Sequence, residues 1–145
     1  MSALPAGVEV RELAVLADER GAVRHFLRAD APHFRGFGEV YFSTVLPGCV
    51  KAWRRHRRAT ANFAVPVGRV RLALWDEATA TLGTLELGAD AYRLVTVPPG
   101  LWTGFLGLSA EPALIANCVS LPHDPAESDR RAPDDPAMPH VWSPA

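Results

Sequence analysis

The residues best suited to chemistry lie in one short segment, which reads Lys51-Ala52-Trp53-Arg54-Arg55-His56-Arg57-Arg58. Histidine is the side chain that gains and loses a proton near neutral pH. Arginine stays charged at every working pH and holds phosphate, carboxylate or enolate oxygens through a forked pair of hydrogen bonds. In a strand, Arg54 and His56 share one face about 7 Å apart, and Lys51 lies on the opposite face. The pattern predicts an arginine that binds an anion beside a histidine that transfers a proton.

Two other interpretations of this basic segment stay open. Charged residues blunt an exposed edge strand against aggregation, and the whole run would then be solvated. Basic residues interleaved with Trp53 can also follow a nucleic-acid backbone. The whole chain, however, has 15 basic against 16 acidic side chains and a pI near 6.5, without the basic excess typical of nucleic-acid-binding proteins. We therefore expect no nucleic-acid partner.

An arginine on an inward strand position loses its hydration, which is costly unless a negative partner replaces the lost water. The sequence offers few carboxylates on strands that could serve, among them Glu39 and Glu86. If neither reaches Arg54, the partner is a ligand. This reasoning predicts a small anionic or carbonyl-bearing substrate, with Arg54 and His56 as the chemical centre.

The segments that must position these residues are short and alternate between apolar and polar side chains. The chain has 145 residues, 48% of them hydrophobic and 21% charged, which is typical of one globular domain. Turn residues recur every 8 to 14 positions, a spacing that predicts an all-β antiparallel sandwich or barrel. The predicted strands are 8–16, 22–28, 38–46, 50–57, 61–67, 70–75, 81–87, 91–97, 102–108 and 113–121.

The composition changes after residue 121. We expect a barrel domain over 1–121 and a proline-rich tail over 122–145, which runs over the barrel surface because proline cannot donate to a strand ladder. Trp142 is expected to anchor the tail by burial. The first ten residues lack the basic start and apolar core of a secretory signal, so we expect a cytoplasmic protein. Prolines interrupt the longest weakly polar stretch, 94–108, so no membrane span is expected.

The glycines and prolines around the basic segment resemble the two motifs of cupin barrels. The first motif fits from Gly48 to Gly68, and the second fits Pro98-Pro99-Gly100. The four metal-ligand positions of these motifs are occupied here by Arg54, His56, Ala61 and Thr103. The resemblance implies a cupin double-stranded β-helix, also called a jelly-roll barrel. One histidine beside an arginine cannot hold a transition metal, so we expect no metal and no other cofactor.

Several blocks together resemble the dTDP-4-dehydrorhamnose 3,5-epimerase-like family over about residues 7–142. These blocks are 18–21, 38–43, 47–53, 98–105, 117–118, 134–136 and 141–142. The resemblance implies a histidine base, a tyrosine acid and a second histidine at positions that here hold Arg54, a residue near Ala116, and Thr103. It also implies that Lys51 and Arg20 contact the substrate or its diphosphate. The further lining residues that we expect are Tyr41, Asn62, Thr103 and Asn117.

The resulting hypothesis is a metal-independent isomerase or epimerase. It would act by proton transfer on a carbonyl-activated nucleotide sugar or a related natural-product intermediate, with His56 as base or acid. One alternative is a cyclase or dehydratase of secondary metabolism on the same fold, and another is a non-catalytic ligand-binding protein that keeps the cavity. The family resemblance also implies a homodimer, in which the alternating segment 8–16 would be exchanged between subunits.

Overall fold

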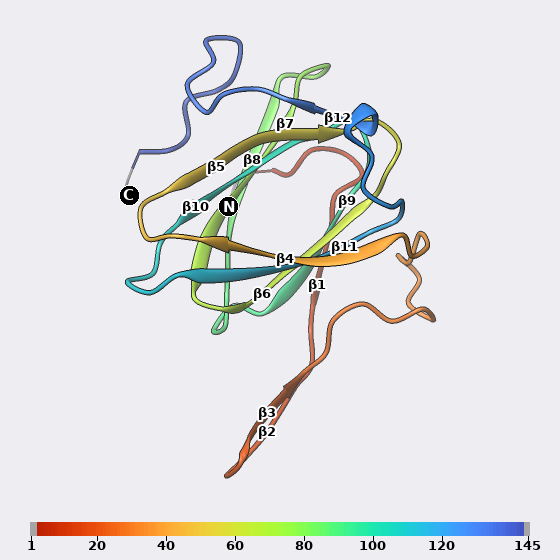
Figure 1. Ribbon diagram of the computed structural model, residues 1–145, viewed down its shortest axis with the longest axis vertical. Coiled ribbons are helices and arrows are strands. Elements are labelled where there is room, and N and C mark those ends of the chain that lie inside the picture. The colour runs from red at the N-terminus through yellow and green to blue at the C-terminus, as the bar shows by residue number, and fades with distance from the viewer. Residues whose placement is uncertain (1–2, 144–145) are drawn as a thin grey trace.

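Two five-stranded antiparallel sheets face each other across the core of the computed structural model, which describes residues 3–143 (Figure 1). The first sheet has the order β1 (Glu9–Glu12), β9 (Arg93–Val97), β6 (Ala61–Val67), β11 (Ala113–Val119) and β4 (Glu39–Val45). The second has the order β12 (Ser128–Arg130), β5 (Val50–His56), β10 (Trp102–Gly107), β7 (Arg69–Asp76) and β8 (Thr81–Gly88). A separate hairpin joins β2 (Val15–Asp18) to β3 (Gly21–Arg24), and a short 3-10 helix, η1, spans Pro125–Glu127.

This architecture confirms the predicted all-β jelly-roll class, and the strand predicted over 61–67 has the same bounds as β6. The predicted strand 8–16 is wrong as one element. Its first part is β1, which pairs with β9 of the same chain, while its last two residues open β2. The break comes at Leu13, whose backbone N–H donates to the Tyr92 carbonyl beside the sheet. From there the chain leaves the barrel.

The sheets enclose an apolar core of inward side chains such as Val65, Leu72, Val95 and Ile115, which are at most 2% exposed. At Gly68 the turn between β6 and β7 has φ of 78°, and an added Cβ would lie 2.7 Å from the Ala113 Cα. Only glycine suits that position.

A second apolar cluster lies on the outer face of the second sheet, under the C-terminal tail. It consists of Trp53, Trp102 and Met138 with Trp142 packed against them, and the Trp53 and Trp142 rings are 5.0 Å apart. The tail therefore runs over the barrel surface. The proline content did not predict a strand in the tail, yet Ser128–Arg130 forms β12 and pairs with β5. The prolines at 125 and 133 flank this three-residue strand rather than interrupting it.

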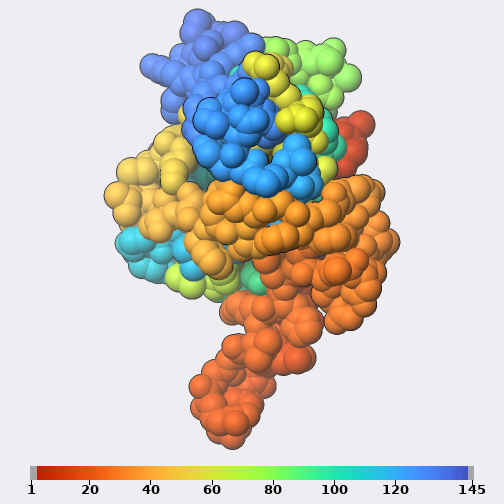
Figure 2. All heavy atoms as spheres, turned by 45° about the vertical axis from the view of Figure 1, so that its right-hand side comes forward, coloured from red at the N-terminus to blue at the C-terminus, as the bar shows by residue number. Residues whose placement is uncertain are grey.

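The β2–β3 hairpin projects from the barrel as an arm (Figures 1 and 2). Its Val15, Leu16 and Val23 side chains are 39%, 61% and 60% exposed. Among residues 3–143 there is no helix long and apolar enough to cross a membrane.

Replacing the tail anchor, Trp142→Ala, is expected to lower the free energy of unfolding by about 2–3 kcal/mol, somewhat less than a fully buried tryptophan would cost. Urea denaturation followed by circular dichroism measures the change. Phe37→Ala is the matched control, since Phe37 is 67% exposed, and a change of less than about 0.5 kcal/mol is expected there. Equal effects of the two substitutions would contradict the anchoring role.

Candidate functional site

A cavity of about 510 Å³ opens between the two sheets, next to β4 and β5. Side chains from β4, β5, β6, β10 and β11 line it, and the tail adds Arg130 and Pro133. Of the residues predicted for the site, the cavity brings together Tyr41, Lys51, Arg54, His56, Thr103 and Asn117.

Two predicted residues lie elsewhere. Arg20 is in the turn of the projecting hairpin, where its guanidinium pairs with Asp18 at 2.7 Å and is 82% exposed. Asn62 is buried in the first sheet, where its amide donates to the Cys118 carbonyl and accepts from the Thr96 hydroxyl at 2.7 Å. Asn62 is thus a satisfied structural residue, and Arg20 does not reach the cavity of its own chain.

An irregularity in β5 changes which side chains face inward. Thr103 of β10 pairs with Arg54, but the next residue, Gly104, pairs with Ala52, so Trp53 is an extra residue without a partner on β10. This bulge interrupts the alternation of faces. The prediction that Lys51 faces away from Arg54 and His56 is therefore wrong, because all three line the same cavity.

Arg54 is held by neutral groups. Its Nη1 donates to the Tyr41 hydroxyl at 3.1 Å, and the Asn117 amide donates to the same hydroxyl at 2.9 Å. Within the described chain Arg54 forms no ion pair, and its buried Nε–H has no hydrogen-bond partner. Two strand carboxylates are engaged elsewhere: Glu39 accepts from the backbone N–H of His123, and Glu86 binds Arg69.

His56 has a carboxylate partner that sequence reasoning missed. Its Nδ1 lies 2.7 Å from Oε1 of Glu127, a buried residue of the tail. The other oxygen, Oε2, accepts the backbone N–H groups of Arg58 and Ala59 at 2.8 and 2.9 Å. No spacing rule marked Glu127, because 71 residues separate it from His56.

The charges around this pair decide its protonation. Burial opposes ionisation of Glu127, but the hydrogen bonds from Arg58, His56 and Ala59 outweigh it and hold its pKa at about 2. Burial lowers the pKa of His56, the Glu127 hydrogen bond raises it, and the charges of Arg54 and Arg130 lower it, with a net decrease. His56 is therefore a neutral imidazole at neutral pH. With Nδ1–H donated to Glu127, its Nε2 lone pair is left to accept a proton.

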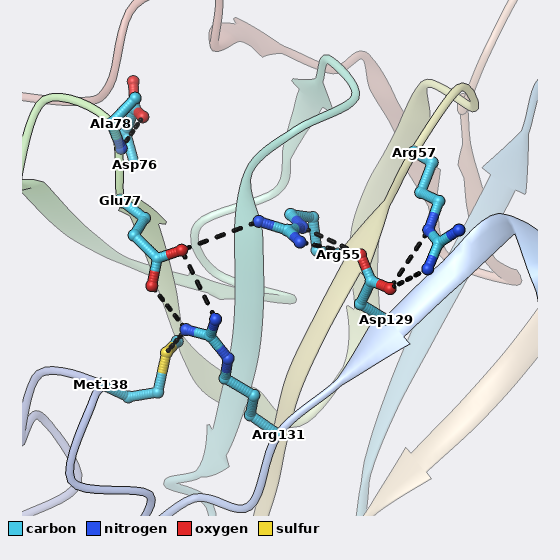
Figure 3. A network of polar contacts seen from close by, with 8 residues as sticks. All are labelled: Arg55, Arg57, Asp76, Glu77, Ala78, Asp129, Arg131 and Met138. Carbon is cyan, nitrogen blue, oxygen red and sulfur yellow. Dashed lines mark hydrogen bonds and ion pairs between the residues drawn. The ribbon is translucent and has the colours of Figure 1, made fainter.

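An ion-pair network fastens β12, the strand that directly follows Glu127 (Figure 3). Asp129, two residues further on, accepts from Arg55 at 2.9 Å and from Arg57 at 2.6 Å. Glu77, in the turn after β7, binds Arg131 at 2.5 Å and lies 3.8 Å from Arg55. The Arg55 and Arg131 guanidinium groups both stack on the Trp102 ring, 4.6 and 4.5 Å from its centroid. The tail is thus fixed to the barrel at Asp129 and Arg131, directly after Glu127.

The cavity does not have the donor set of a cupin metal centre. Besides His56, the corresponding positions hold Arg54, Ala61 and Thr103, and the His56 Nδ1 is already bound to Glu127. Across residues 3–143, no group of three or more His, Cys, Asp or Glu side chains could hold a metal ion. These residues do not suit a transition metal.

A phenol occupies the cavity from a different strand than the family resemblance implied. Ala116 is buried on β11, and its neighbour Asn117 pairs in register with Tyr41 of β4. The Tyr41 hydroxyl accepts hydrogen bonds from Arg54 and Asn117, so its own proton remains available.

The sequence and the fold are both similar to those of sugar epimerases and isomerases. The chain is 33% identical over 136 residues to a probable low-salt glycan biosynthesis epimerase of Haloferax volcanii, covering 88% of this chain and 87% of that protein. It is 44% identical to a dTDP sugar isomerase of Desulfovibrio desulfuricans, with a TM-score of 0.91 and coverage of 97% and 93%. A 3'-monoepimerase of Streptomyces bikiniensis in complex with dTDP-quinovose shares the fold at 18% identity, with a TM-score of 0.81 over 94% of this chain and 75% of that one. No protein-family model matches the sequence.

Replacing the carboxylate with an amide, Glu127→Gln, is expected to lower the pKa of His56 further, because it removes the negative charge that favours the imidazolium. Imidazole ¹⁵N chemical shifts measured against pH report this value directly. An unchanged or higher pKa would contradict the pairing.

The same substitution changes the acid stability. The pKa of Glu127 is about 2 in the folded protein against an ordinary 4.5, so its stabilisation is complete above about pH 4.5 and is lost as the pH falls toward 2. The variant should lack this part of the acid transition in urea denaturation curves. Glu111→Gln, at an exposed position, is the matched control and should retain it.

Proposed function

The chain belongs to the dTDP-4-dehydrorhamnose 3,5-epimerase-like family of sugar epimerases and isomerases, and we propose that it isomerises or epimerises a nucleotide sugar activated by a ketone, with His56 as the proton-transferring group. The observation that carries this proposal is that His56 lines the cavity and is hydrogen-bonded to the Glu127 carboxylate. A base near neutral pKa, oriented by a carboxylate, is what proton removal beside a carbonyl requires.

Glu127 acts in this proposal as a positioning residue. It holds the Nδ1–H tautomer, so Nε2 of His56 is the atom that accepts a proton from the carbon next to the ketone. Negative charge then develops on the ketone oxygen and needs a nearby positive charge or hydrogen-bond donor. Lys51 can supply it, since this residue lines the cavity and its Nζ donates to the Ser43 hydroxyl at 2.7 Å and to the Thr44 carbonyl at 3.2 Å.

Tyr41 is suited to return the proton. Its hydroxyl accepts from Arg54 and Asn117, which leaves its O–H for an atom in the cavity. It comes from β4 of the first sheet, whereas His56 comes from β5 of the second, so the two groups lie on different walls. A ligand between the sheets could lose a proton to one wall and gain one from the other, which inverts a carbon centre.

One observation favours a second candidate, a ligand-binding protein without turnover. The position that holds the base in the family resemblance is Arg54, which cannot accept a proton. In that case the cavity would bind a nucleotide sugar, and His56 and Glu127 would only shape it. Binding is common to both proposals, so only proton exchange separates them.

In D₂O, the protein is expected to catalyse exchange of the protons beside the ketone of dTDP-4-keto-6-deoxyglucose, followed by ¹H NMR. His56→Gln should slow this exchange by about 10²–10⁴-fold, while calorimetry gives a dissociation constant within about twofold of the parent. His123→Gln, an exposed histidine in the tail, is the matched control. Binding without exchange by the parent protein would instead support the second candidate.

We also propose a homodimer whose contact includes the projecting hairpin. Its Val15, Leu16 and Val23 are exposed apolar residues on an arm that packs little against its own barrel (Figure 2). The outer side of the edge strand β4 adds Val40 and Phe42, which are 43% and 64% exposed. Apolar surface of this kind marks an interaction site, and a second copy of the chain is the partner that the family resemblance implies.

Light scattering at micromolar concentration is expected to give about 31 kDa, twice the 15.7 kDa of one chain. The double substitution Leu16→Asp and Val23→Asp should shift the mass to that of a monomer without changing the circular dichroism spectrum. A parent protein of about 16 kDa would overturn the dimer.

A further inference from the structure

The two tyrosines of the chain use their hydroxyl groups in opposite ways. The Tyr92 hydroxyl donates its proton to the His25 carbonyl at 2.6 Å and is satisfied within the fold. The Tyr41 oxygen accepts one hydrogen bond from Arg54 and one from Asn117, and no acceptor among the described residues takes its proton. Because Tyr41 lines the cavity, its O–H is free to donate to a ligand there.

The two donors to Tyr41 come from different sheets. Arg54 Nη1 reaches across from β5 at 3.1 Å, whereas Asn117 lies beside Tyr41 in register on β11 and donates at 2.9 Å. Hydrogen bonds to a phenol oxygen stabilise its phenolate form, most of all when one donor carries a positive charge. Arg54 is half-buried and forms no ion pair in the described chain. Loss of the Tyr41 proton therefore gives Arg54 the counter-charge that the resting protein lacks.

His56 and Glu127 form the complementary arrangement on the second sheet. The imidazole is neutral, and its Nδ1 lies 2.7 Å from the Glu127 carboxylate, so a proton gained at Nε2 completes an ion pair. During proton transfer His56 becomes a cation beside a permanent anion, and Tyr41 becomes an anion beside a permanent cation. Each charge that the reaction creates on the protein thus has its counter-charge already in place, which is electrostatic preorganisation.

From this geometry we propose that Arg54 is a positioning residue for Tyr41, whose phenolate it stabilises so that the phenol can protonate the enolate carbon. The inference rests on the proposed function, in which Tyr41 returns the proton. It adds a role for the arginine at the position where the family resemblance places a base.

The proton steps balance within one turnover. His56 Nε2 takes the proton from the carbon beside the ketone, and the C–H electron pair forms the double bond of the enolate. That electron pair then takes the Tyr41 proton on the opposite face, which inverts the carbon and leaves an imidazolium and a phenolate. Water carries one proton from the imidazolium to the phenolate and restores both groups.

The diphosphate of a nucleotide sugar is the other anion that an arginine in this cavity suits. The orientation of Arg54 favours Tyr41 over the diphosphate. Its Nη1 donates to the phenol oxygen, and its Nε–H is buried, so the edge formed by Nε and Nη2 is not open to a forked contact with a phosphate. A direct role on the diphosphate predicts weaker dTDP binding after substitution, whereas a role through Tyr41 predicts a slower protonation step.

The test follows exchange and inversion of dTDP-4-keto-6-deoxyglucose in D₂O by ¹H NMR. Exchange beside the ketone needs the His56 base alone, whereas inversion at the same carbon also needs the Tyr41 acid. Tyr41→Phe and Arg54→Met are each expected to slow inversion by about 10²-fold, with exchange and the dTDP dissociation constant within about threefold of the parent. Arg54→Lys keeps the positive charge and should recover about tenfold of the lost rate.

A double variant shows whether Arg54 acts through Tyr41. Tyr41→Phe combined with Arg54→Met should invert no more slowly than Tyr41→Phe alone, because the arginine has no phenolate to stabilise once the hydroxyl is gone. Tyr92→Phe, which removes the other tyrosine hydroxyl, and Arg58→Met, at an exposed position just after β5, are the matched controls. Both should invert the sugar at the rate of the parent.

The outcomes separate this role from the proposed function. Losses that multiply in the double variant would assign Arg54 to the ligand and overturn the role, and so would an Arg54→Met protein that binds dTDP about tenfold more weakly. Exchange without inversion by the parent would overturn it as well, while His56 remains the base. Absence of exchange in the parent would overturn the proposed function and this inference with it. Circular dichroism establishes that each variant is folded.

Discussion

The Glu127 carboxylate joins three parts of the chain that are otherwise separate. One oxygen binds the His56 ring, the other binds the backbone after β5 at Arg58 and Ala59, and the residue itself belongs to the tail. A buried carboxylate is stable only with such compensation, and each of these donors would be left unsatisfied without it. The same contact therefore closes the tail on the barrel and sets the protonation state of the histidine. Asp129 secures it by pairing with Arg55 of β5 and with Arg57 just after that strand.

Arg54 illustrates the opposite arrangement. The Glu127 carboxylate is fully paired with hydrogen-bond donors. Arg54 instead donates to the Tyr41 hydroxyl, which also accepts from the Asn117 amide, and no carboxylate of the described residues pairs with Arg54. Neutral hydrogen bonds fix the direction of a guanidinium while leaving its charge for another partner. An arginine held only by neutral groups contributes little to the stability of the protein without a ligand. Its electrostatic benefit comes when an anion enters the cavity.

The barrel and its tail contribute differently to the packing of the fold and to the site. The core between the sheets, around Leu72 and Ile115, contains no residue of the tail. The cluster around Trp53 and Trp142 on the outer face exists only because the tail covers it. That covering brings Glu127 to His56 and Arg130 to the cavity, so the site is complete only while the tail is bound to the barrel.

The sequence by itself determined the all-β class, most strand positions and the central pair, because alternation and turn residues are local properties and Arg54 and His56 are two positions apart. It could not reveal Glu127, since a contact across 71 residues leaves no local pattern. Nor could it show that Lys51 shares the cavity, because the extra residue at Trp53 depends on how β5 pairs with β10. Asn62 was plausible by residue type, but its burial is decided by the pairing of β6 with the distant strands β9 and β11. Arg20 was plausible too, but the β2–β3 hairpin that carries it projects from the barrel and away from the cavity. Only the tertiary structure sets which side chains meet, because burial and long-range pairing override local preference.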